Sequence, residues 1–105
     1  MSKAQTERIK KMESYLDEAG AVIAELAEAM DKYEKIQSKY YKLEYYYGST
    51  KWIDDYEADE AGKLPAELKR GVLSEDAVYD LITDHSALMA RMQRAVLRSI
   101  ENKGF

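Results

Sequence analysis

Apolar residues recur at alternating intervals of three and four through the first half of the chain. They are Ile9, Met12, Leu16, Ala19, Ile23, Leu26, Met30, Tyr33 and Tyr40, with Gln37 as the one polar residue in the series. This spacing places them on one stripe of an α-helix, the a/d seam of a helix that packs lengthwise on another. It predicts one long helix over residues 3–47. Ser2 and Gln5 form its capping box, and Gly48 ends it.

A second apolar stripe occupies the C-terminal part of the chain. Its members are Val78, Leu81, Ile82, His85, Leu88, Met89, Met92, Val96 and Ile100. They predict a helix over residues 75–102. Ser74 is the expected N-cap, and Glu75 and Asp76 place negative charge at the positive end of the helix dipole. Because no segment alternates with the period of a strand, the predicted fold class is all-α.

The connection over residues 48–74 contains residues that typically begin and end helices, and they predict two further short helical segments. Ser49 or Thr50 can cap a short helix over about residues 50–60, which ends near Gly62. A one-turn helix is then expected from Pro65 to Arg70, closed by a following glycine.

Two long helices joined by a compact connection pack antiparallel. The expected architecture is therefore a long antiparallel helical hairpin with coiled-coil-like packing, in a single domain that spans residues 1–105. Arg91, Arg94 and Arg98 share one face of the last helix, and antiparallel pairing would bring them towards Glu25 and Glu28 of the first.

The two predicted long helices differ in length. At 1.5 Å per residue they measure about 67 Å and about 42 Å, so about 15–20 N-terminal residues extend beyond the hairpin. This overhang carries the apolar residues Ile9, Met12, Tyr15, Leu16 and Ala19. Since an apolar seam in water needs a partner, we expect two chains to pair through it as an antiparallel or bundle-like homodimer.

Composition narrows the classes of protein that this chain can represent. With 105 residues, 46% hydrophobic and 34% charged, it is globular rather than disordered. No apolar run approaches the roughly 20 residues of a membrane-spanning helix, and the N-terminal residues lack the apolar core of a secretory signal. The absence of cysteine excludes disulfides. We therefore expect a cytoplasmic protein that makes no membrane contact.

Charge gives little support for a nucleic-acid partner. The net charge is −4, and the acidic excess lies in residues 48–77, which hold 4 basic and 8 acidic side chains. Nucleic-acid binding draws its affinity from basic patches. The alternative that stays open is a nucleic-acid-associated regulator that uses Arg91, Arg94 and Arg98 as a basic stripe.

Residues able to carry catalysis are sparse. The single histidine, His85, lies within the apolar stripe of the last helix and reads as a residue at the edge of the core. Adjacent carboxylates such as Asp54 and Asp55 point about 100° apart on a helix and do not converge. No calcium loop, phosphate loop or histidine-pair metal motif is present. We therefore expect no enzyme, no cofactor and no metal site.

The aromatic residues around the connection are the strongest candidates for a binding site. Tyr47, Trp52 and Tyr56, with Lys69 and Arg70, could line a groove suited to a peptide or an anionic group of another protein. The alternative is that these aromatic faces pack with Leu64, Leu68, Val72 and Leu73 as a small closed core. Both arrangements stay open at the level of sequence.

The segment Leu64-Pro65-Ala66-Glu67-Leu68-Lys69-Arg70-Gly71-Val72-Leu73-Ser74-Glu75-Asp76, with Tyr79 and Leu81, resembles the bacterial domain-of-unknown-function family 4298. Residues 43–49 with Trp52, and residues 55–60, extend the likeness, which runs from about Ile9 to Leu88. An aspartate is usual in the family where this chain has Glu67. The resemblance implies a small, bacterial, intracellular helical protein with no assigned activity, and therefore no catalytic residue that can be carried over.

Overall fold

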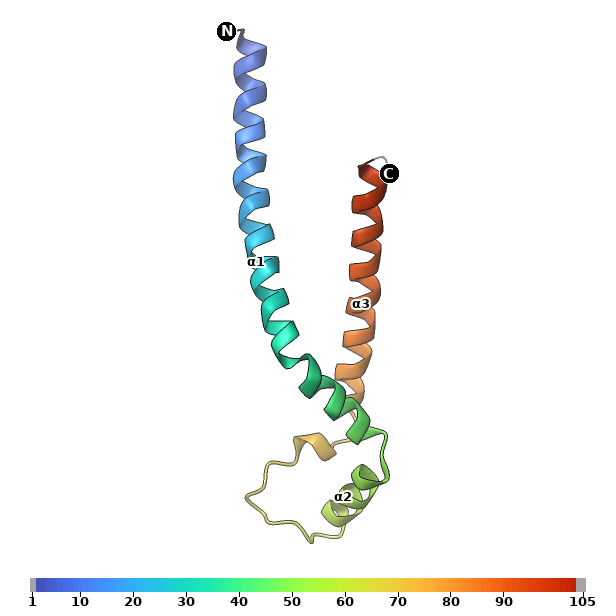
Figure 1. Cartoon of the computed structure of the whole chain (residues 1–105). Coiled ribbons are helices and arrows are strands. Elements are labelled where there is room, and N and C mark those ends of the chain that lie inside the picture. The colour runs from blue at the N-terminus through green and yellow to red at the C-terminus, as the bar shows by residue number, and fades with distance from the viewer. Residues whose placement is uncertain (1, 104–105) are drawn as a thin grey trace. The chain divides into compact units, whose positions relative to one another are not determined.

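The structure is a computed structural model that describes residues 2–103. Within this range the elements are α1 (Lys3–Tyr47), α2 (Thr50–Glu60), the 3₁₀ turn η1 (Gly71–Leu73) and α3 (Ala77–Asn102), and there is no strand (Figure 1). The predicted all-α class and the order of helix, connection and helix are confirmed. No described helix combines the length and the apolar character that crossing a membrane requires.

The chain divides into two compact units, residues 1–39 and residues 40–105. The boundary falls inside α1. We call them the N-terminal unit and the C-terminal unit. The coiled-coil packing of α1 with α3 stays a prediction, as do the ion pairs expected between their charged faces. The assignment of the whole chain to a single domain is also still a prediction.

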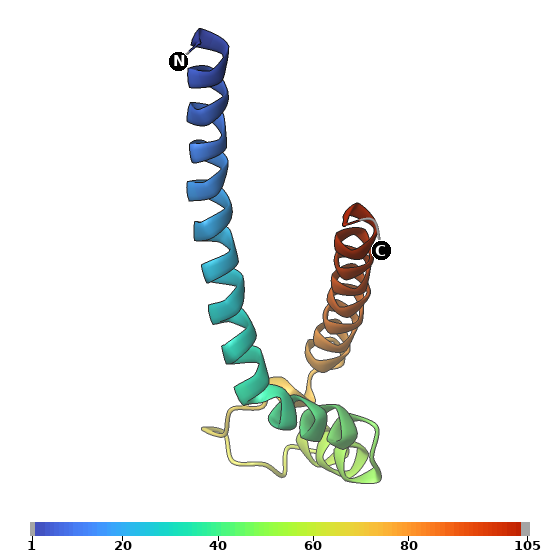
Figure 2. The same ribbon diagram turned by 45° about the horizontal axis from the view of Figure 1, so that its top comes forward.

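The N-terminal unit is a single stretch of helix. Ser2 caps it, because its hydroxyl oxygen accepts the backbone N–H of Gln5 at 3.0 Å, as the capping box predicts. The helix runs through Gly20 without interruption (Figure 2). One pair of opposite charges spaced i,i+4 forms an ion pair on this helix: the Lys32 Nζ lies 3.9 Å from the Glu28 Oε1.

The end of α1 differs from the prediction in its geometry. Gly48 follows the helix, but it does not adopt the left-handed conformation of a C′ glycine. The Tyr46 carbonyl is satisfied instead by Ser49, whose backbone N–H and hydroxyl both donate to it, at 3.0 and 2.6 Å. Ser49 is the N-cap residue of α2, yet its side chain caps no α2 amide.

Gly62 ends α2 in the way that was expected of a terminating glycine. Its φ is +69°, and the N–H groups of Gly62 and Lys63 donate to the carbonyls of Asp59 and Ala58 at 3.0 and 2.9 Å. These two bonds form a Schellman motif, in which glycine adopts the left-handed conformation without a steric penalty.

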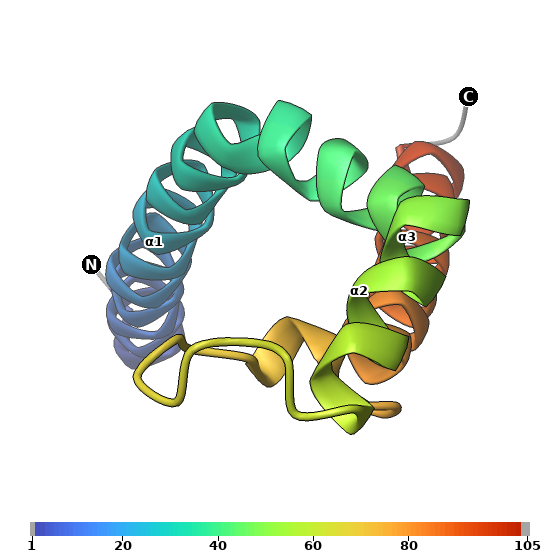
Figure 3. The same cartoon turned by 90° about the horizontal axis from the view of Figure 1, so that it is seen from below.

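The one-turn helix predicted from Pro65 to Arg70 is wrong. The chain leaves α2 as an open loop (Figure 3), and residues 65–68 form only a turn, closed by a bond from the Leu68 N–H to the Pro65 carbonyl at 3.1 Å. An isolated turn gains one hydrogen bond for several fixed dihedrals. The helical turn forms instead at Gly71–Leu73, where Leu73 is buried.

The start of α3 lies two residues later than predicted. Asp76 is the N-cap residue and makes no side-chain capping bond. Ser74 still contributes, since its hydroxyl accepts the Ala77 N–H at 3.2 Å and donates to the Gly71 carbonyl at 2.9 Å.

The core of the C-terminal unit is small. Tyr40, Leu73 and Val78 are its buried apolar residues. The Tyr40 ring stacks on His85 with centroids 4.1 Å apart and planes 26° apart, so one side chain near the end of α1 contacts one side chain of α3. The histidine is half-buried, at the edge of this core, as the sequence indicates.

Candidate functional site

Tyr47, Trp52 and Tyr56 form an aromatic stack at the junction of α1 and α2. The ring centroids of Tyr47 and Trp52 lie 5.1 Å apart in an edge-to-face arrangement, and those of Trp52 and Tyr56 lie 5.2 Å apart and nearly parallel. Trp52 and Tyr56 are one helical turn apart, so α2 places their rings side by side. All three residues are half-buried.

The polar tip of each ring in the aromatic stack donates a hydrogen bond to the segment before α3. The Trp52 indole N–H donates to the Val72 carbonyl at 3.0 Å. The Tyr47 hydroxyl reaches the Glu75 carbonyl at 3.4 Å, and the Tyr56 hydroxyl reaches the Glu75 carboxylate at 3.1 Å. These bonds join residues far apart in the chain, so the stack acts as a clamp that holds α2 and the end of α1 to residues 72–75.

The two basic candidates have different surroundings. The Arg70 guanidinium donates to the Asp59 carboxylate at 2.5 Å, and the side chains of this pair are 37% and 22% exposed. Lys69 is exposed on the surface. Arg70 is therefore engaged with the acidic segment of α2, while Lys69 is the cation better placed to meet a ligand.

A hollow of about 350 Å³ lies beside the clamp, within the C-terminal unit. We call it the connection pocket. Its apolar wall comes from the loop and η1, and its polar rim comes from α1, α2 and the basic pair. The lining residues are Tyr46, Asp55, Leu64, Leu68, Lys69, Arg70, Val72 and Leu73. An apolar wall with a few polar groups at its edge is the usual composition of a binding pocket.

A hydrogen bond crosses the rim of the connection pocket. The Tyr46 hydroxyl donates to the Asp55 carboxylate at 2.6 Å. This bond, together with burial and the Asp55 charge, raises the pKa of Tyr46 to about 12. The bond to Glu75 likewise raises the pKa of Tyr56, with added effect from the charge of Glu60. The Tyr46 phenol therefore stays a protonated donor at pH values where a free tyrosine is ionised.

Only part of the predicted groove lies at this pocket. Lys69 and Arg70 line it, whereas the rings of the aromatic stack are engaged in the clamp. Sequence reasoning missed Tyr46 and Asp55 as lining residues. The four-residue spacing of Leu64, Leu68 and Val72 was the available signal for the apolar wall, and the sequence left open whether these residues close a core or line a groove.

The predicted self-association residues all lie on the surface of the N-terminal unit. Ile9, Met12, Tyr15 and Leu16 are between 44% and 65% exposed, and Ala19 is exposed as well. The exposed seam continues through Val22, Ile23 and Leu26.

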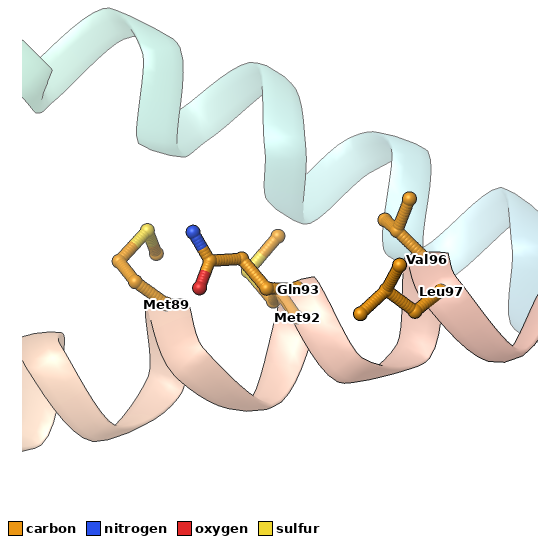
Figure 4. Close-up of a pocket in the computed structure, with 5 residues that line it drawn as sticks. All are labelled: Met89, Met92, Gln93, Val96 and Leu97. Atoms are coloured by element: carbon orange, nitrogen blue, oxygen red, sulfur yellow. The ribbon is translucent and has the colours of Figure 1, made fainter.

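Two different faces are present on α3. Arg91, Arg94 and Arg98 line one hollow together with Ala95. A second hollow is lined by Met89, Met92, Gln93, Val96 and Leu97, whose side chains project from one side of the helix (Figure 4). The basic stripe and this mainly apolar surface are thus separate parts of the helix.

No group of three histidine, aspartate or glutamate side chains among residues 2–103 is arranged to hold a metal ion.

Taken together, the order of elements and the clamped connection define a small all-α protein of two long helices joined by a short helix and a 3₁₀ turn. A family model described as domain of unknown function (DUF4298) matches residues 9–95. The chain therefore belongs to the DUF4298 family, as its sequence indicates. No curated protein and no solved structure matched the chain in the same comparisons.

Proposed function

We propose that this protein is a non-catalytic protein-interaction module of the bacterial cytoplasm. It self-associates as a homodimer through the seam of α1 and offers the connection pocket to a second protein.

The observation that supports this proposal is the exposed seam on a helix too long for its own chain to cover. α1 has 45 residues and α3 has 26, which correspond to about 67 Å and about 39 Å. Whatever their arrangement, α3 is too short by several turns. Continuous apolar surface of this kind marks a protein-interaction site.

Absolute mass measured by light scattering on a size-exclusion column tests the self-association. The wild-type chain is expected to elute with the mass of a dimer. Leu16→Glu places a charge in the middle of the seam and should give a monomer. Ser14→Glu adds the same charge on the opposite side of the same helical turn and should leave the dimer intact. A wild-type monomer at every concentration would contradict the proposal.

The connection pocket is tested by variants that leave the clamp in place. Leu68→Asp and Lys69→Ala change the wall and the rim, since Leu68 is 49% exposed and Lys69 lies on the surface. A partner protein recovered with the wild-type chain should be lost with these variants and kept with Tyr45→Ala, because Tyr45 is 82% exposed and outside the pocket. Retention by every variant would remove the pocket as the contact surface.

A nucleic-acid-associated role is the second candidate. It is supported by the three arginines that line one hollow of α3 and by the absence of acidic residues between Asp84 and Glu101. A gel shift at about 50 mM salt, where phosphate contacts are strong, decides it. No shift with the wild-type chain, or a shift that persists in the triple alanine variant of Arg91, Arg94 and Arg98, would rule it out.

A further inference from the structure

We infer that two copies of this chain pair through α1 with the helices parallel and in register. This inference rests on the proposed self-association and adds the direction and the alignment of the pair.

The apolar stripe of α1 is wider than a two-stranded seam requires. If Ile9, Leu16 and Ile23 are assigned to position a of successive heptads, the apolar d positions are flanked by a further apolar row at position g. That row consists of Tyr15, Val22, Ala29 and Ile36, all exposed. A stripe over a, d and g is the pattern of a helix with more than one neighbour in a bundle. A helix of its own chain on one side would therefore still leave a side of α1 for a second copy.

The charges that flank the seam favour the parallel direction. In a parallel pair a g residue faces the e residue of the partner's next heptad, and these contacts set the orientation. Arg8 is at g and Glu13 is at the following e position, so parallel helices place opposite charges together. In an antiparallel pair e faces e, and the only charged e residues of this segment are Glu13 and Glu34. Like charges would then meet.

The remaining acidic residues of the segment do not reverse this preference. Asp17, Glu18, Glu25, Glu28 and Asp31 fall at b, c and f positions, on the outer side of the helix. Charges that far from the partner are separated by more than the screening length of about 8 Å at physiological salt. The Arg8 and Glu13 side chains, which lie next to the seam, therefore decide whether the two helices pair parallel or antiparallel.

Gln37 supplies an independent argument for the alignment. It is the polar residue at an a position of α1. In a parallel in-register pair it meets Gln37 of the second copy, and the two amides can hydrogen-bond to each other. A single polar a residue of this kind fixes register in coiled coils. In an antiparallel pair a residues face d residues, and Gln37 would meet an apolar side chain that leaves its amide without a partner.

Single cysteines test the direction cleanly, because the chain has none of its own. Met12 is at d and half exposed, and parallel pairing places it against Met12 of the second copy. Met12→Cys alone should therefore form an interchain disulfide under mild oxidation. In the antiparallel register that places Glu13 against Glu34, position 12 faces position 37, so a disulfide would form only in a mixture of Met12→Cys and Gln37→Cys chains. Ser14→Cys, on the outer face, is the control and should form none.

Association strength gives a second readout. Glu13→Gln removes the attraction to Arg8 in a parallel pair and should raise the dimer dissociation constant about twofold. In an antiparallel pair the same change relieves a repulsion and lowers that constant. Glu34→Gln is the matched control, because Ala29 occupies the facing g position in a parallel pair and no change is expected.

The outcomes separate the two proposals. A wild-type chain that is monomeric by light scattering overturns self-association and direction together. A dimer whose cysteine variants cross-link only in the mixture overturns the parallel direction and leaves self-association standing.

Discussion

Trp52 donates its indole N–H to the carbonyl of Val72, 20 residues later in the chain, at 3.0 Å. The bond fixes η1 against α2, and the rings of Tyr47 and Tyr56 both contact the indole. Because Trp52 is the only tryptophan of the chain, its fluorescence reports directly on this clamp.

Trp52→Phe should lower the free energy of unfolding. The variant keeps an aromatic ring but removes the donor, which leaves the Val72 carbonyl without this partner. The expected loss is about 1 kcal/mol for the hydrogen bond, with a further loss from the smaller ring. Chemical denaturation followed by circular dichroism at fixed protein concentration measures it. A change no larger than that of Tyr45→Phe on the surface would contradict the clamp.

The pair of Arg70 and Asp59 should show measurable coupling. Its 2.5 Å contact and partial burial distinguish it from the exposed pair of Lys10 and Glu7 at 3.8 Å. In a double-mutant cycle with alanine we expect a coupling energy of about 1 kcal/mol for Arg70 with Asp59 and about 0.3 kcal/mol for Lys10 with Glu7. Equal coupling energies for the two pairs would show that partial burial does not strengthen the Arg70–Asp59 ion pair.

Tyr40→Ala should destabilise the C-terminal unit strongly. Tyr40 is 6% exposed, stacks on His85 and donates its hydroxyl to Glu44 at 2.8 Å. Removing a buried aromatic side chain costs about 3 kcal/mol or more. Tyr45→Ala, on the same helix but 82% exposed, should change stability by less than about 0.5 kcal/mol. Similar losses for the two variants would refute the assignment of Tyr40 to the core.

Two glycine-to-alanine changes should act in opposite directions. An added Cβ meets nothing within 4 Å at Gly62 or at Gly20, so only backbone conformation differs. Gly62 has a φ of +69°, and alanine there should cost about 1 kcal/mol. Gly20 is inside a helix, where alanine should add about 0.5–1 kcal/mol. Thermal unfolding of both variants tests this prediction. It is wrong if the two substitutions shift the melting temperature in the same direction.

Stability should fall at alkaline pH in part because of Tyr46. Its folded pKa of about 12 exceeds the usual tyrosine value of 10.0. Between these values the folded chain holds the proton more tightly than the unfolded chain, so the free energy of unfolding decreases as pH rises. The contribution is fully present below about pH 10. Tyr46→Phe should flatten this part of the profile, as seen in urea titrations from pH 9 to pH 12. An unchanged slope would show that the bond to Asp55 does not persist in solution.

The helices themselves were predictable because their signals are local. The spacing of Ile9, Met12 and Leu16 identifies α1, and Ser2 and Gly62 mark helix ends through bonds that reach no more than five residues along the chain. Each backbone N–H within a helix finds its partner four residues away. Sequence alone therefore suffices for the position of α1 and α2.

The connection could not be predicted in the same way. Pro65 is a good first residue for a helix, yet the turn that formed lies at Gly71–Leu73. The deciding partners were distant: the Trp52 indole on the Val72 carbonyl, and two tyrosine hydroxyls on Glu75. Backbone carbonyls of an irregular segment carry no residue-specific signal, so their pairing is invisible in the sequence.

The sequence by itself determined an all-α chain, its family, and an apolar seam along α1. Tertiary structure decided that the aromatic stack is a clamp, that Arg70 is held by Asp59, and that the pocket opens beside Leu68 and Lys69. The physical reason is the range of the interactions. Helical periodicity is set within one or two turns, whereas the role of each side chain in the connection depends on which distant backbone and carboxylate groups the fold brings within hydrogen-bonding distance.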